Sequence, residues 1–207
     1  MFEEFCENFK QELISYSGYS QFPLKGEMLE ERISKALEDS RIAHLWEQGS
    51  HNPGADIHLT ALGLNWSVKS GQWSGKRAPK LSISSHRTTK YKTLQEKIEY
   101  FDGPGKNYTH YFILTRQETD TERHYRAYII DASLISASSR EWVTKASGWT
   151  SQKRDGVTIQ IQKAMSDQFW IYVDKATIED SSLVTEVISI SFPLSQLGKT
   201  HQLVKAA

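Results

Sequence analysis

Two side chains of opposite charge, Asp56 and Lys69, are the residues of this chain whose types and spacing best suit chemistry. Asp56 follows Pro53-Gly54-Ala55, which is typical of a tight turn, and precedes the short run Ile57-His58-Leu59. Lys69 ends a second strand-like run, residues 64–69. If the two runs form a hairpin, the carboxylate and the amine lie at the same edge of a sheet. There, a carboxylate beside a lysine can hold a hard cation and activate a nearby water.

A helix is predicted ahead of this hairpin, over residues 26–39, and it can deliver a second carboxylate. Its inner face is apolar, and Glu30 lies on the edge of that face, where it can be aimed at the sheet edge. Glu27 lies one turn earlier on a similar edge. The alternative for both is an acid that only interacts favourably with the N-terminal end of the helix dipole.

The remaining pattern predicts a single α/β domain over residues 1–207, with a central mixed β-sheet flanked by helices. The catalytic core is expected at about 26–130, and C-terminal strands within 157–192 complete the fold. Helices are expected at 2–16, 93–101 and 134–142, a polar loop at 144–156, and strands at 81–85, 108–115, 123–130, 157–162, 169–173 and 187–192.

The charge distribution is uneven, although 25 basic and 25 acidic residues give a formal net charge of zero. Between Ile57 and Gln95 there is no acid, and the sequence favours one basic face that meets a polyanion. The seven basic residues of this stretch are Lys69, Lys76, Arg77, Lys80, Arg87, Lys90 and Lys92.

Several other classes of protein find no support in the sequence. The single Cys6 excludes an internal disulfide and suits a reducing cytoplasm, where we expect the protein. No signal peptide is visible, and no apolar run approaches the roughly 20 residues of a spanning helix, so no membrane association is expected. Zinc-ligand spacing, a phosphate-binding glycine loop and a Gly-x-Ser-x-Gly motif are also missing from the sequence.

The order of these features resembles the PD-(D/E)xK nuclease superfamily, and type II restriction endonucleases in particular. Pro53-Gly54-Ala55-Asp56 matches the first half-motif, Ser67-Val68-Lys69 the second, and Glu30 the additional glutamate on a preceding helix. The likeness covers residues 26–92, about a third of the chain. It implies a restriction-endonuclease-like fold and metal-dependent hydrolysis of DNA.

The sequence departs from the family pattern at Ser67, which stands where the family usually has an acid. Some restriction enzymes with Ser-x-Lys recruit a glutamate from elsewhere, and Glu30 is the first candidate here. Glu27, Glu31 and Glu96 are the alternatives. The resemblance then implies that Asp56, Glu30 and the Val68 carbonyl hold Mg²⁺, with Mn²⁺ able to substitute, while Lys69 orients or deprotonates the attacking water and Ser67 completes the catalytic set.

Contacts to DNA are expected from the polar and basic residues that follow the second half-motif. Arg87 has the geometry to read guanine bidentately, and the lysines would contact phosphates. Each of these side chains could equally be an ordinary solvated residue. The expected DNA-binding residues are Ser70, Gln72, Lys76, Arg77, Ser84, Ser85, His86, Arg87, Lys90 and Lys92.

The function expected from the sequence is a Mg²⁺-dependent, site-specific double-stranded DNA endonuclease. A homodimer is expected, because two-fold protein symmetry matches the symmetry of a palindromic site. One alternative is a repair or junction-cleaving nuclease of the same fold. Another is a DNA-binding module without catalysis, which Ser67 suggests. The simplest alternative for Asp56 and Lys69 is a salt bridge that only closes a hairpin.

Overall fold

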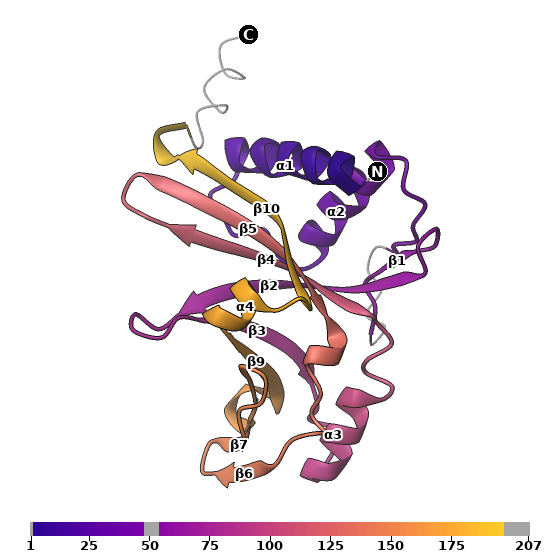
Figure 1. Cartoon of the computed structure of the whole chain (residues 1–207), viewed down its shortest axis with the longest axis vertical. Helices are drawn as coiled ribbons and strands as arrows, with labels where there is room; N and C mark the ends of the chain where they lie inside the picture. The colour runs from indigo at the N-terminus through magenta and orange to yellow at the C-terminus, as the bar shows by residue number, and fades with distance from the viewer. Residues whose placement is uncertain (1, 48–53, 197–207) are drawn as a thin grey trace.

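The computed structural model describes residues 2–47 and 54–196, which form one ten-stranded mixed sheet with helices on both faces (Figure 1). The helices are α1 (Phe2–Tyr19), α2 (Glu27–Asp39), α3 (Leu94–Asp102) and α4 (Lys175–Asp180). The strands are β1 (Ile57–Leu59), β2 (Leu64–Ser74), β3 (Lys80–Arg87), β4 (His110–Glu118), β5 (Glu122–Asp131), β6 (Trp142–Lys145), β7 (Gly148–Ser151), β8 (Val157–Gln162), β9 (Gln168–Asp174) and β10 (Val184–Pro193).

The predicted mixed sheet with flanking helices is confirmed. Its strand order is β10-β5-β4-β2-β3-β9-β8-β7-β6, and β1 pairs with β2 outside this path. Strands β2 and β4 run parallel, because the β2–β3 hairpin reverses the chain and α3 then connects β3 to β4 at the end of the sheet where β2 begins. The other paired strands are antiparallel. No described helix has the length and apolar character needed to cross a membrane.

Helices α1 and α2 cover one face of the half of the sheet formed by β2, β4, β5 and β10, which we call the first half-sheet (Figure 1). The apolar stripe of α1 places Phe5 and Phe9 against Phe112 of β4, with ring centroids 6.2 and 5.6 Å away. Trp66 of β2 lies 5.8 Å from Phe5 and is fully buried. Each large side chain buried in this way contributes about 1.5–3 kcal/mol, so the stripe holds α1 on the sheet.

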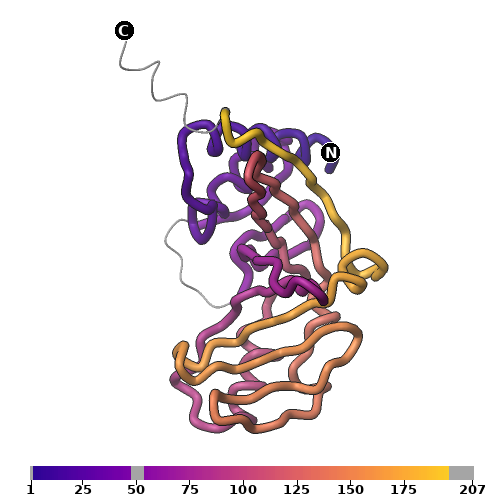
Figure 2. Tube along the Cα trace, turned by 90° about the vertical axis from the view of Figure 1, so that its left-hand side faces the viewer, coloured from indigo at the N-terminus to yellow at the C-terminus, as the bar shows by residue number. Residues whose placement is uncertain are grey.

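A second core lies on the opposite face and extends under the second half-sheet, which we define as β3, β9, β8, β7 and β6. Thr93 and Glu96 form a capping box that begins α3, and α3 then buries Ile98 and Phe101. The Phe101 ring stacks on Phe169 of β9 at 4.4 Å. In Figure 2 the orange strands β6 to β9 lie at the opposite end of the molecule from α1 and α2.

One edge of β2 is divided between two partners, and this division positions the candidate site. Strand β1 pairs with residues 64–66, and β3 pairs with residues 71–74. Neither strand pairs with residues 67–70 on that edge. The other edge of this stretch pairs with β4 from Trp66 to Gly71. The sheet is therefore continuous on one side of Ser67-Val68-Lys69 and interrupted on the other.

Two predictions about the middle of the chain were wrong. The expected helix at 134–142 does not form: only Ala132–Leu134 makes a 3₁₀ turn. The carboxylate of Asp102 instead accepts hydrogen bonds from the backbone N–H groups of Ala137 and Ser138, and residues 137–140 form a bend and turn outside any helix. The expected loop at 144–156 contains the β6–β7 hairpin.

Candidate functional site

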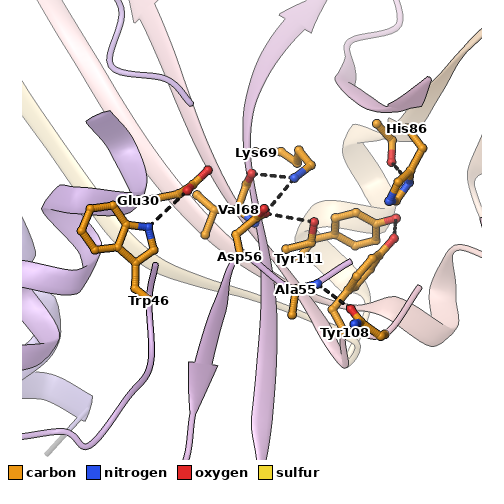
Figure 3. A network of polar contacts seen from close by, with 12 residues as sticks. Glu30, Trp46, Ala55, Asp56, Val68, Lys69, His86, Tyr108 and Tyr111 are labelled. Carbon is orange, nitrogen blue, oxygen red and sulfur yellow. Dashed lines mark hydrogen bonds and ion pairs between the residues drawn. The ribbon is translucent and has the colours of Figure 1, made fainter. Parts of the chain in front are cut away.

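Asp56 and Lys69 meet at the divided edge of β2, as the sequence predicted (Figure 3). The backbone N–H of Asp56 donates to the carbonyl of Trp66 at 2.8 Å, which begins the β1–β2 pairing. Oδ2 of Asp56 then accepts from the backbone N–H of Val68 at 2.6 Å and from Nζ of Lys69 at 2.8 Å. The Asp56 carboxylate thus accepts from the Val68 N–H, which neither β1 nor β3 pairs with at this edge of β2.

The turn before Asp56 is held by Asn107, a residue that the sequence analysis did not identify. Oδ1 of Asn107 accepts a hydrogen bond from the backbone N–H of Ala55 at 2.6 Å. Gly54 has a φ of 112°, and a Cβ at that position would lie 1.6 Å from Oδ1 of Asn107. Glycine is therefore required for this turn to approach Asn107. Pro53, the first residue of the predicted turn, lies outside the described residues.

Lys69 connects the two oxygen atoms that the sequence analysis assigned to a metal ion. Its Nζ donates to Oδ2 of Asp56 at 2.8 Å and to the carbonyl oxygen of Val68 at 2.9 Å. The side chains of Lys69 and Asp56 are 24% and 20% exposed. The pair is thus desolvated enough for its charges to matter, yet it remains accessible from solvent.

Glu30 supplies a second carboxylate close to this pair. It lies on α2, is half-buried, and its Oε2 accepts from Nε1 of Trp46 at 3.3 Å (Figure 3). Burial raises the pKa of Glu30, and the negative charge of Asp56 raises it further, while the Lys69 ammonium acts in the opposite direction. In Figure 3 the Glu30 side chain extends from α2 towards Val68 and Asp56.

The other candidate glutamates differ from Glu30. Glu27 and Glu31 are exposed on α2. Glu96 forms the capping box of α3, where its carboxylate accepts from the backbone N–H groups of Lys92 and Thr93 and has a lowered pKa because of these bonds. Glu30 is half-buried, and its pKa responds to the charges of Asp56 and Lys69.

Ser67 occupies the position where the resembled family usually has an acid. Its side chain is fully buried and its Oγ donates to Oδ2 of Asp56 at 3.3 Å. It lies on the same face of β2 as Lys69, since alternate residues of a strand share a face. The hydroxyl therefore orients the Asp56 carboxylate and adds no charge to the site.

An aromatic cluster supports the opposite side of the site. The β3–β9 register shifts between Ser84 and Arg87, and the side chain of His86 packs beside Phe101 and Tyr108 of the second core. Burial and the positive charge of Lys69 lower the pKa of His86 to about 4, so the ring is neutral at pH 7. Ser85 is also buried, and its Oγ lies 3.0 Å from Nδ1 of His86.

The residues predicted to contact DNA fall into three groups. Ser85 and His86 are packed inward, so a role in DNA contact would require their exposure. Lys76 and Arg77 are exposed at the β2–β3 turn, and Arg87, Lys90 and Lys92 are exposed at and after the end of β3, with Lys90 above the rings of Tyr91 and Tyr100. Ser70, Gln72 and Ser84 line one groove.

The oxygen donors of the site suit a hard divalent cation. Asp56, Glu30 and the Val68 carbonyl provide two carboxylates and a neutral oxygen, and Mg²⁺ commonly keeps several waters beside so few protein ligands. The ammonium of Lys69 already lies between two of these oxygens, which shows that they favour a positive charge. Among the described residues, no three His, Cys, Asp or Glu side chains gather as a metal-binding group.

Comparison with protein-family models, with curated proteins and with solved structures found no match.

Proposed function

We propose that this protein is a Mg²⁺-dependent, site-specific endonuclease of double-stranded DNA, similar in type to a type II restriction enzyme. The observation that carries the proposal is the meeting of Asp56 and Lys69 at the interrupted edge of β2, with Glu30 close enough to be affected by both charges. A salt bridge that only closed a hairpin would not need a half-buried second carboxylate beside it, because such placement costs solvation and like-charge repulsion.

The residues have separable roles in phosphodiester hydrolysis. Bound Mg²⁺ would neutralise charge on the scissile phosphate and polarise a water. Asp56, Glu30 and the Val68 carbonyl would hold the ion, and Ser67 and the Val68 N–H would fix the Asp56 carboxylate through the bonds described above. The Lys69 ammonium would orient the attacking water, or deprotonate it after losing its own proton, and would balance the charge that develops on the phosphate.

Duplex DNA is proposed as the partner because exposed basic residues lie at both ends of β3. Lys76 and Arg77 lie before it, and Arg87, Lys90 and Lys92 lie at and beyond its end. Such residues bind phosphates without reading sequence. A homodimer would place two sites in the symmetric arrangement that cleavage of both strands of a palindrome requires.

Ser67 favours a second candidate function, a DNA-binding protein without catalysis. A buried hydroxyl takes the place of an acid, and two of the three N–H groups of Lys69 are engaged by Asp56 and Val68. In such a protein the pair would only stabilise the divided edge of the sheet.

The experiment that separates the two functions is incubation of the purified protein with plasmid DNA in Mg²⁺, followed by sequencing of the fragment ends. We expect discrete cuts at one short sequence, and no cuts with EDTA. Retention of duplex DNA without cleavage in Mg²⁺ or Mn²⁺ would support the binding protein instead.

A further inference from the structure

The second half-sheet has one apolar and one polar face. Its apolar face buries alternate residues of β3, β9 and β8 in the second core. The alternate positions between them are half-exposed. Two cross-strand rows of uncharged side chains occupy the middle of this polar face, and the second row continues onto the neighbouring strand β2. The first row is Ser84, Trp170 and Gln160, and the second is Gln72, Ser82 and Tyr172.

The polar face begins next to the candidate site. Ser70 follows Lys69 in β2 but lies on the opposite face, and with Gln72, Ser82, Ser84 and Trp170 it lines a groove of about 500 Å³. Residues 23–25, in the connection between α1 and α2, also line the groove. A strand rises about 3.3 Å per residue, so Gln72 lies roughly 10 Å along β2 from Lys69. The Lys69 side chain lies on the other face of β2, so a duplex in this groove would reach the candidate site from the face on which α2 and Glu30 lie.

Two buried polar atoms at this groove have no hydrogen-bond partner. The hydroxyl of Tyr125 and Nε1 of Trp170 are both unpaired among the described residues, and both side chains line the groove. Tyr125 is fully buried. Buried polar side-chain atoms are paired in the large majority of cases, so these atoms indicate that the groove can offer hydrogen bonds to a bound molecule.

The chemistry of this face suits bases better than phosphates. Serine hydroxyls, glutamine amides and the tyrosine hydroxyl offer both donors and acceptors without charge, which is what base edges require. Phosphates are bound mainly through charge. Lys25 and Arg116 are the basic residues that line the groove, whereas the exposed basic residues of the stretch 57–95 lie at the β2–β3 turn and at and beyond the end of β3. Arg116, at the groove, is already paired with Glu118.

From this placement we propose that the polar face of β2, β3, β9 and β8 is the surface that reads the DNA sequence, with Gln72, Trp170 and Gln160 contacting base edges in the major groove. Strands can enter that groove, which is wide enough for a two-stranded ribbon. The inference rests on the proposed DNA-cleaving function, and it adds Ser82, Gln160, Trp170 and Tyr172 to the residues expected from the sequence.

The test is affinity selection of a random duplex pool by the full-length protein in Ca²⁺, with the retained DNA sequenced. Gln72→Ala, Gln160→Ala and Trp170→Phe are compared with the wild type, and Thr185→Ala on β10 is the control, because Thr185 is exposed on a distant strand. We expect each groove-face variant to lose about tenfold discrimination at one or two base pairs. The control should retain the wild-type preference, and all variants should keep the wild-type circular dichroism spectrum and melting temperature.

An unchanged sequence preference in all three variants would overturn the inference, as would a wild-type protein that retains DNA without any preference. Either result leaves cleavage at Asp56 and Lys69 possible. A wild-type protein that neither retains nor cuts any duplex would instead overturn the proposed function itself, and this inference with it.

Discussion

Two lysine–carboxylate pairs in this molecule have almost the same geometry but differ in their surroundings. Nζ of Lys69 lies 2.8 Å from Asp56, and Nζ of Lys97 lies 2.9 Å from Asp167. The side chain of Lys97 is 1% exposed, whereas that of Lys69 is 24% exposed. Lys97 also donates to the carbonyls of Thr88 and Tyr91, so its three N–H groups all have partners.

The difference separates a structural pair from one that can do chemistry. Lys97 ties α3 to the loop that follows β3 and to the turn before β9, and its hydrogen bonds are complete. Lys69 has two protein acceptors and retains a donor for a third, and Glu30 provides a second negative charge nearby. A short ion pair alone is therefore weak evidence for an active site, and the unfilled hydrogen-bonding capacity beside it is the informative feature.

The largest expected contrast comes from the matched variants Lys69→Met and Lys97→Met. Lys69→Met should lower the single-turnover cleavage rate at least a hundredfold and leave the free energy of unfolding nearly unchanged. Lys97→Met should lower the free energy of unfolding by about 3 kcal/mol, because it leaves Asp167 and two carbonyls without their donor. Urea unfolding and cleavage rates measure the two effects. If both substitutions lowered the free energy of unfolding equally, the distinction between a structural Lys97 pair and a catalytic Lys69 pair would be lost.

Glu30→Gln should lower cleavage about tenfold or more, because it removes a carboxylate from the proposed metal site. It should also stabilise the protein at neutral pH. Burial and Asp56 raise the pKa of Glu30 in the folded state, so ionisation opposes folding. In the wild type, the ionisation of Glu30 therefore lowers the free energy of unfolding as the pH rises above 4.5, the ordinary pKa of a glutamate. The loss is complete once the pH exceeds the raised pKa of Glu30 in the folded protein.

The control for this prediction is Glu27→Gln, on the exposed side of the same helix. Melting temperatures of both variants and the wild type are compared from pH 4 to pH 8. The advantage of Glu30→Gln should grow with pH and vanish near pH 4. If Glu27→Gln lost more cleavage activity than Glu30→Gln, Glu30 would not be the second carboxylate of the proposed metal site.

Asn107→Ala should have a smaller effect, a loss of about tenfold in cleavage rate with unchanged DNA affinity. Asn107 holds the turn that aims Asp56, and small displacements of a catalytic group are costly. The measurement is the single-turnover rate at saturating DNA. Thr109 belongs to the same loop and contacts the backbone of Asn65, so Thr109→Ala serves as the control. A fall in affinity without a fall in rate would place Asn107 in DNA binding instead.

The smallest effect is expected at the β2–β3 turn. Lys76→Ala and Arg77→Ala should each weaken duplex binding a few-fold, equally for all sequences. The slope of log affinity against log salt should fall by about one for each lost phosphate contact. Fluorescence anisotropy at several salt concentrations measures both quantities. An unchanged slope would mean that these residues do not meet DNA.

Local pattern predicted much of this fold and the centre of the candidate site. The helical stripe of α1, the β1–β2 hairpin and the β4–β5 pair are local, and they place Asp56 and Lys69 correctly. The parallel pairing of β2 with β4, and the interruption at residues 67–70, arise from contacts between distant segments. Asn107 and Lys97 were missed for the same reason. The helix predicted at 134–142 does not form, because the carboxylate of Asp102, distant in sequence, binds the backbone N–H of Ala137.

The most direct test of the central claim is a time course of supercoiled plasmid in Mg²⁺ with the wild type and with Asp56→Asn. Asparagine preserves an oxygen that can accept from the Val68 N–H but removes the charge, so folding and duplex binding should persist. We predict that the wild type linearises the plasmid and that Asp56→Asn is slower by about a thousandfold or more. Cleavage by Asp56→Asn at the wild-type rate would contradict the account.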